Sequence, residues 1–170
     1  VIDLNYSETV ALLPTDFKGV KPKVMIKEGE EVKIGSPLFF DKQNPDIKWA
    51  SPASGKIKNI TFGPRRVLQK IEISSSKTPD YIEYKKYKKS EIINLKREEV
   101  LTTILDANIF PMFRQRPFNI IPDPQIIPRD IFVSAINTAP HSVDLESVIE
   151  KNIEKFQAGI DALNALSTGR

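Results

Sequence analysis

The sequence predicts a mixed α and β protein, in which an N-terminal barrel-sandwich β-module precedes the start of an α/β domain. Short apolar strands alternate with tight turns, and Gly29, Gly35 and Gly55 can adopt the positive φ that such turns require. Further along, a continuous apolar run precedes a helical pattern, as in parallel α/β sheets. We expect three regions: residues 1–75 as the β-module, 76–90 as a linker and 91–170 as the start of the α/β domain.

The β-module is predicted to consist of two similar halves, each made of a strand, a turn and a second strand. They cover residues 24–38 and 50–60, and residues 67–73 form the closing strand. This arrangement resembles biotinyl and lipoyl carrier domains, in which a lysine at the hairpin between the halves is modified. Here we expect the hairpin tip at 44–46. Lys42 is the one candidate lysine, but it lacks the flanking residues of those carriers, so a solvated lysine is the simpler interpretation.

The C-terminal half begins with a predicted helix over residues 96–107, because apolar residues recur there at helical spacing. A loop rich in proline follows from 109 to 128 and cannot be a regular element. Residues 130–136 are predicted as a buried strand, and 144–166 as one long helix, which Ser142 or Asp144 caps. One strand cannot form a sheet, so we expect this chain to be a portion of a longer protein.

Composition excludes several kinds of site. The chain of 170 residues contains no cysteine, which excludes disulfides, zinc–thiolate sites, cysteine-ligated iron–sulfur clusters and a thiol nucleophile. No apolar run approaches the roughly 20 residues that span a bilayer. Residues 1–90 hold 17 Lys and Arg against 11 Asp and Glu, a net charge of +6. Because these lysines alternate with apolar strand positions, and aromatic residues for base stacking are missing, we expect a solvated face and no nucleic-acid partner.

Several motifs occur in order along nearly the whole chain. They are Val10–Leu13, Val20–Pro22, Lys27–Lys33, Pro52–Lys56, Gly63–Gln69, Arg114–Phe118 and Phe156–Leu163. Together they resemble the A-subunit family of the bacterial Na(+)-translocating NADH:quinone reductases. The most specific parts of the resemblance are Gly-x-x-Arg-Val-Leu-Gln and Arg-x-Arg-Pro-Phe. On this resemblance, the chain corresponds to an N-terminal portion of that family's members.

The resemblance implies a peripheral subunit on the cytoplasmic face of the bacterial inner membrane, which contacts the membrane only through partner subunits. The six-subunit complex passes electrons from NADH through flavins and iron–sulfur centres to ubiquinone while it exports Na⁺. Proteins related to this family hold flavin phosphate on a glycine-rich loop. The matching stretch here, 106–118, contains no glycine. We therefore expect no flavin, metal or other cofactor in this chain.

The proline-rich loop carries most of the candidate site residues. Its large apolar side chains and its two arginines suit the ring and the carbonyl oxygens of a quinone. Packing of the loop or docking of a neighbouring subunit is the alternative. A second pair of arginines follows a Gly-Pro turn and is expected at an interface. The candidates are Phe110, Phe113, Arg114, Arg116, Phe118, Arg65 and Arg66, with Met112 beside them.

His141 is the only histidine, so a metal site with two histidines is excluded. It lies between the predicted strand and helix, where α/β proteins often place ligands. His141 and Asp144 could perform acid–base chemistry, but a loop histidine beside a helix cap is the simpler interpretation. We expect no catalytic residue in this chain. The alternative function is a carrier-like or binding module without a redox partner.

Overall fold

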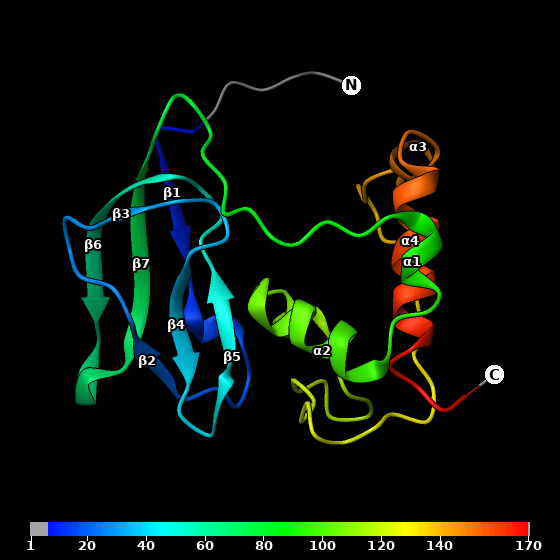
Figure 1. Ribbon diagram of the computed structural model, residues 1–170. Helices are drawn as coiled ribbons and strands as arrows, with labels where there is room; N and C mark the ends of the chain where they lie inside the picture. Colours follow the sequence, from blue (N-terminus) through cyan, green and yellow to red (C-terminus); the bar gives the residue numbers. More distant parts are fainter. Residues whose placement is uncertain (1–6, 170) are drawn as a thin grey trace. The chain divides into compact units, whose positions relative to one another are not determined.

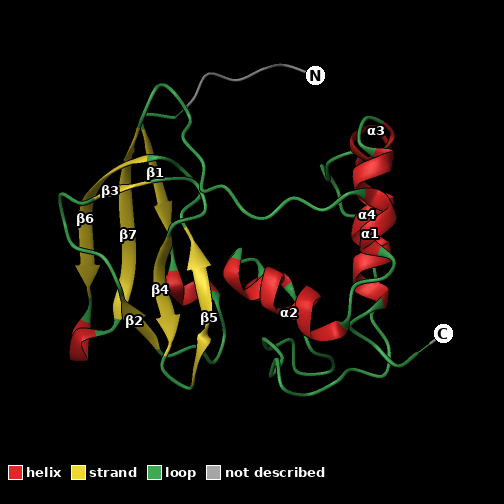
Figure 2. Cartoon of the chain, in the orientation of Figure 1, coloured by secondary structure: helices red, strands yellow, loops and turns green. Residues whose placement is uncertain are grey.

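The computed structural model describes residues 7–169 (Figure 1). Every strand in this part of the chain lies before residue 76, and the α-helices lie after residue 88 (Figure 2). The strands are β1 (Thr9–Leu12), β2 (Pro22–Val24), β3 (Glu31–Val32), β4 (Pro37–Asp41), β5 (Asn44–Ala50), β6 (Gly55–Phe62) and β7 (Leu68–Ser75). The helices are η1 (Pro14–Asp16), η2 (Pro64–Arg66), α1 (Lys89–Ile92), α2 (Arg97–Asp106), η3 (Phe110–Met112), α3 (Leu145–Glu150) and α4 (Ile153–Asn164).

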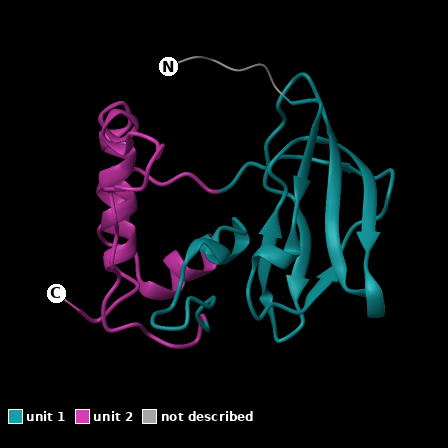
Figure 3. Cartoon of the chain, turned by 180° about the vertical axis from the view of Figure 1, so that it is seen from behind, with its two compact units in different colours: residues 1–84, 104–123 teal, residues 85–103, 124–170 magenta. Residues whose placement is uncertain are grey.

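The chain divides into two compact units (Figure 3). Unit 1 comprises 1–84 and 104–123, and unit 2 comprises 85–103 and 124–170. The segment 104–123 therefore belongs to the same unit as the strands, although it follows them in sequence by almost thirty residues. The domain limits at 75, 76–90 and 91 remain predictions.

Unit 1 is built from two antiparallel sheets. The strand order is β1-β7-β6-β3 in one sheet and β2-β4-β5 in the other. Alternation of apolar and polar residues sends one side of each strand inward, so Ile71 and Ile73 of β7 are buried together with Ile57 of β6. Leu68, at the start of β7, is buried as well. In the other sheet, the ring of Phe39 stacks on Trp49 at 4.6 Å between ring centroids. The predicted β-module and its closing strand are confirmed.

The three predicted turn glycines adopt positive φ: 84° at Gly29, 97° at Gly35 and 145° at Gly55. Gly55 meets a second constraint, because a Cβ atom built there would lie 2.0 Å from the carbonyl oxygen of Ser74. Strand β6 therefore begins where no side chain fits against β7.

The hairpin between β4 and β5 is tighter than predicted. Strand β4 ends at Asp41 and β5 begins at Asn44, so the tip is Lys42 and Gln43, and the prediction of a tip at 44–46 was wrong. The buried carboxylate of Asp41 explains the difference, because its Oδ1 accepts the backbone N–H groups of Gln43 and Lys21, both at 3.1 Å. Pro45 is tolerated inside β5 because β5 is an edge strand.

Unit 2 contains helices and irregular segments. The predicted helix over 96–107 is confirmed as α2, of which the first seven residues belong to this unit. The predicted long helix over 144–166 is interrupted, because α3 ends at Glu150 and α4 begins at Ile153. Asn152 lies at the break, where its side-chain amide donates to the carbonyl of Val148. Asp144 caps α3 as predicted, since its Oδ1 accepts the N–H of Glu146 at 3.1 Å.

The predicted strand over 130–136 does not form. Its backbone is irregular, and Phe132 is 90% exposed. A strand needs a neighbour for its backbone hydrogen bonds, and unit 2, as far as it is described, contains no other strand. The residues are apolar, as the prediction assumed, but the element it implied was wrong.

Candidate functional site

The candidate site is the segment from 104 to 123, here called the loop segment, which joins the end of α2 to the irregular part of unit 2. After α2 ends at Asp106, the chain turns through Asn108, whose φ is 57°. The backbone N–H of Asn108 donates to Leu105, and that of Ile109 donates to Ile104. Asparagine tolerates this left-handed conformation better than most residues do. The turn then leads into the short helix η3.

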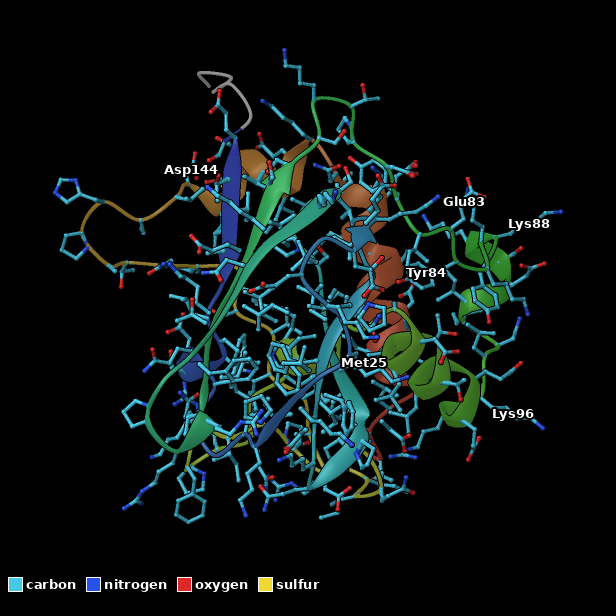
Figure 4. All side chains as sticks on the ribbon, turned by 90° about the vertical axis from the view of Figure 1, so that its left-hand side faces the viewer. Met25, Glu83, Tyr84, Lys88, Lys96 and Asp144 are labelled. Carbon is cyan, nitrogen blue, oxygen red and sulfur yellow. The ribbon has the colours of Figure 1, made fainter. Side chains whose placement is uncertain are left out.

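A partly buried polar contact holds the loop segment to the barrel. The side chain of Asn108 is 5% exposed, and its Nδ2 donates to the carbonyl oxygen of Gly35 at 3.0 Å. The hydroxyl of Tyr84, labelled in Figure 4, donates to the same oxygen at 3.3 Å. Burial raises the pKa of the Tyr84 hydroxyl above its ordinary value, so it remains a donor at neutral pH. The turn of the barrel at Gly35 thus anchors Tyr84 and Asn108, which follow it in the sequence by 49 and 73 residues.

Replacing Asn108 by alanine is expected to destabilise unit 1 by about 1–3 kcal/mol, because the partly buried carbonyl of Gly35 loses a donor and alanine disfavours the left-handed conformation. Urea unfolding followed by the fluorescence of Trp49, the only tryptophan, measures this loss. Asn119→Ala is the matched control, since Asn119 has a φ of 55° but is exposed. Equal losses in the two variants would show that the contact with Gly35 contributes nothing.

Aromatic packing fixes the first part of the loop segment. Phe110 is buried, η3 packs against β5, and the ring of Phe113 lies 5.4 Å from that of Phe110. The guanidinium of Arg114 donates to the carbonyl oxygens of Pro111 and Phe113 and lies 5.8 Å from the ring centroid of Phe17. Phe110, Phe113 and Arg114 therefore serve the internal structure of unit 1.

The second part of the loop segment projects outward. Backbone bonds from Gln115 to Ile120 at 2.7 Å and from Asn119 to Gln115 at 2.9 Å close a tight turn. Arg116 and Phe118 lie within this turn, and Phe118 is 67% exposed. None of the ion pairs within residues 7–169 includes Arg116. The turn thus presents one large apolar ring and one cation on a closed backbone frame.

The second pair of candidate arginines lies elsewhere in unit 1. Arg65 and Arg66 are exposed in the turn from Gly63 to Val67, at the end of β6 (Figure 1). Both adopt left-handed backbone, with φ values of 56° and 58°. The predicted turn is confirmed, but the candidates form two groups rather than one.

Of the remaining candidates, Lys42 is exposed at the β4–β5 turn and His141 is exposed in unit 2 with a φ of 59°. Both carboxylate oxygens of Asp144 accept hydrogen bonds in the first turn of α3. The hydrogen bond from Ser147 is the main cause of the lowered pKa of this carboxyl group. Within residues 7–169, no group of three or more His, Cys, Asp or Glu residues could hold a metal ion. The geometry gives no support to acid–base chemistry by His141 and Asp144.

Sequence reasoning missed the residues that anchor the loop segment. Tyr84 falls in the predicted linker over 76–90, and Asn108 falls between the predicted helix over 96–107 and the predicted loop over 109–128. The available signal was an asparagine directly after a predicted helix, where a left-handed residue often ends the helix.

Two family models match the chain. The NqrA N-terminal barrel-sandwich hybrid domain matches residues 1–76, and the NqrA second alpha/beta domain matches residues 95–170. The chain belongs to the NqrA family, the A subunits of Na(+)-translocating NADH-quinone reductases. The family therefore has the predicted order of domains, a barrel-sandwich hybrid followed by an α/β domain.

Curated relatives agree with this assignment. The chain is 36% identical over 159 residues, 94% of its length, to the A subunit of the Na(+)-translocating NADH-quinone reductase of Pseudomonas aeruginosa strain UCBPP-PA14. It is 38% identical over 162 residues, 95% of its length, to the corresponding protein of Serratia proteamaculans strain 568. In both cases the match spans 36% of the relative, so the chain corresponds to about a third of its relatives' length. Among residues 7–169, no helix is long and apolar enough to cross a bilayer.

Proposed function

We propose that this chain acts within a peripheral subunit of a Na(+)-translocating NADH-quinone reductase and that its loop segment docks a neighbouring subunit. The turn from Gln115 to Ile120 supports this most directly, because it holds Phe118 and Arg116 outward on a frame anchored to the barrel. An exposed aromatic ring beside an arginine is typical of the residues that dominate protein interfaces. The subunit then lies on the cytoplasmic face of the inner membrane and contributes to assembly of a six-subunit complex and to ubiquinone reduction.

In this proposal the redox groups belong to partner subunits. NADH, flavins, iron–sulfur centres and ubiquinone serve the complex, and this chain holds no flavin or metal. Support comes from the backbone at 106–118, where every residue carries a side chain and no glycine allows close approach of a phosphate. The carbonyl groups of Pro111 and Phe113 also take the Nη1 donor of Arg114, so that nitrogen is not available to a quinone oxygen.

Phe118→Ala and Arg116→Ala test docking against quinone contact. If the loop segment docks a subunit, each change lowers the amount of assembled complex, with a loss on the order of 2 kcal/mol in docking free energy, or about thirtyfold in affinity. The KM for ubiquinone per assembled complex stays the same. Assembly is measured by co-purification, and the quinone KM by steady-state kinetics.

A direct quinone contact gives the opposite pattern. Loss of a charge-assisted hydrogen bond of about 1.5–3 kcal/mol raises the quinone KM roughly tenfold or more, while assembly and NADH oxidation by an artificial acceptor are unchanged. Phe132→Ala is the control for truncation of an exposed phenylalanine outside the loop segment. Normal assembly and normal KM in the Arg116→Ala, Phe118→Ala double variant would remove the loop segment from both interpretations.

One observation favours the carrier alternative. Lys42 lies in an exposed two-residue turn between β4 and β5, as carrier modules require of a modified lysine. Intact mass measurement of the natively expressed protein decides the matter. A mass increase that maps to Lys42 supports a carrier, and an unmodified mass removes this alternative.

A further inference from the structure

The barrel of unit 1 is not closed on the side where β2 leads toward β3. A groove of about 450 Å³, here called the seam groove, separates residues 24–28 from Ile60 and Phe62 of β6. Its apolar lining comes from Val24, Met25, Ile60 and Phe62. Figure 4 labels Met25 at the end of β2. All of these residues belong to unit 1.

Strand pairing explains why the seam groove is open. Strand β2 pairs only with β4, and β3 pairs with β6 only through Gly55 and Lys56. The second half of β6 therefore has β7 as its strand neighbour on one side and no strand, among those described, on the other. The backbone N–H of Ile60 on that open side is taken by the carboxylate of Glu28, whose Oε1 lies 2.8 Å away. A carboxylate stands where a partner strand would otherwise bind.

The seam groove is apolar where a barrel surface is usually polar. Met25 is 45% exposed and Phe62 is 51% exposed. Exposed apolar side chains that gather beside an open strand edge are characteristic of interaction surfaces.

One cation lines the groove, and two more follow its residue Phe62 closely in the sequence. Lys27 contributes to its lining, and Arg65 and Arg66 follow Phe62 within four residues. All three side chains are exposed, and none takes part in an ion pair within residues 7–169. The two arginines occupy left-handed backbone that glycine would adopt with less strain. Arginine at both positions despite that strain suggests that the two side chains bind another molecule.

We propose that the seam groove binds an extended segment of another subunit, in which apolar side chains are flanked by carboxylates. The apolar lining accommodates the former, and Lys27, Arg65 and Arg66 attract the latter. The carboxylate of Glu28 accepts the backbone N–H of Ile60, so the carboxylates of the segment pair with the three cations and not with this edge. This inference rests on the proposed function, because it needs a multi-subunit complex to supply the segment.

Photo-crosslinking in the assembled complex tests the proposal. The full-length protein carries p-benzoylphenylalanine in place of Met25, and a second version carries it in place of Leu13, which is also partly exposed but does not line the groove. Met25 is expected to crosslink to one peptide of another subunit that contains acidic and apolar residues. Leu13 is expected to leave that peptide uncrosslinked.

A charge test accompanies the crosslink. Arg65→Gly with Arg66→Gly removes two cations and suits the left-handed turn, so the barrel keeps its fold while crosslinking from position 25 falls by about two- to fivefold. The matched control, Lys18→Gly with Lys42→Gly, removes two cations from exposed turns that do not line the groove and leaves the yield unchanged. Circular dichroism and urea unfolding verify that both double variants are folded.

The outcomes separate this inference from the proposed function. If the protein does not co-purify with a reductase complex, both are overturned. If the complex assembles and Met25 yields no crosslink, or reaches a lipid, a nucleic acid or a second copy of this chain, only the seam groove proposal is overturned. A peptide crosslink that does not respond to loss of Arg65 and Arg66 also contradicts it, because the stated partner is acidic.

Discussion

Gly55→Ala is expected to lower the free energy of unfolding of unit 1 by at least about 4 kcal/mol, or to prevent folding. The new Cβ would lie 2.0 Å from the carbonyl oxygen of Ser74 and 3.0 Å from the backbone nitrogen of Ser76. Neither atom belongs to a side chain that can rotate away. The backbone cannot retreat easily either, because Ser76 donates to the carbonyl of Ser54 at 2.7 Å and β6 pairs with β7 from Gly55 onward. The φ of 145° adds strain for any residue with a side chain.

Gly19→Ala separates the clash from the backbone strain. Gly19 also has positive φ, 83°, but a Cβ atom there would meet nothing within 4 Å. Its replacement is expected to cost only about 1 kcal/mol, from backbone strain alone. Urea unfolding followed by Trp49 fluorescence compares the two variants. Similar losses for Gly55→Ala and Gly19→Ala would show that β6 can shift away from β7, contrary to the packing described.

Phe39→Ala is expected to cost about 3–5 kcal/mol. Phe39 is fully buried between the sheets and stacks on Trp49 at 4.6 Å with an interplanar angle of 14°. Truncation removes apolar burial and the ring contact and leaves a cavity, since Trp49 is also held edge-on by Phe17 at 5.3 Å. Because the change alters the surroundings of Trp49, unfolding is best followed by circular dichroism.

Phe118→Ala serves as the comparison for this prediction. The ring of Phe118 is largely exposed in the same unit, so its loss is expected to change stability by less than about 0.5 kcal/mol. The same variant tests docking, and intact stability would show that a loss of assembly comes from the interface. Equal destabilisation by Phe39→Ala and Phe118→Ala would contradict the buried role of Phe39.

The barrel could be predicted from local patterns because its signals are local. Alternation along β7 places Ile71 and Ile73 inside, and positive φ at Gly29 and Gly35 fits the turns. The hairpin tip was missed because one buried carboxylate, that of Asp41, outweighed the usual turn preference of Asn-Pro-Asp. A hydrogen bond from the turn backbone to a side chain of the same turn does not change the pattern of apolar and polar residues, so that pattern could not reveal it.

The strand predicted at 130–136 failed for a different reason. An apolar run specifies that residues prefer burial, whereas a strand exists only when another strand accepts its hydrogen bonds. Such pairing is a property of distant segments and cannot be read from the run itself.

The candidate site was predicted in part. The aromatic and arginine content of the loop segment indicated its location, but the division into an anchored part and a projecting part could not be foreseen. That division depends on Asn108 reaching Gly35, 73 residues earlier in the chain. Arg114 and Arg116 look equivalent in sequence, yet one binds carbonyl groups of its own loop and the other faces outward. Long-range contacts decide which arginine is available to a partner.

The division of the chain into units has a practical consequence for dissecting this protein. Unit membership changes at 84–85, at 103–104 and again at 123–124, so three peptide linkages tie the two units together. A single protease cut cannot release the barrel whole. An expressed fragment that stops at residue 76, where the first family match ends, would lack Asn108, Phe110 and Pro111, all of which are buried in the intact chain. Such a fragment would expose the surface of β5 on which η3 packs to solvent, so any property measured on it would belong to an incomplete barrel.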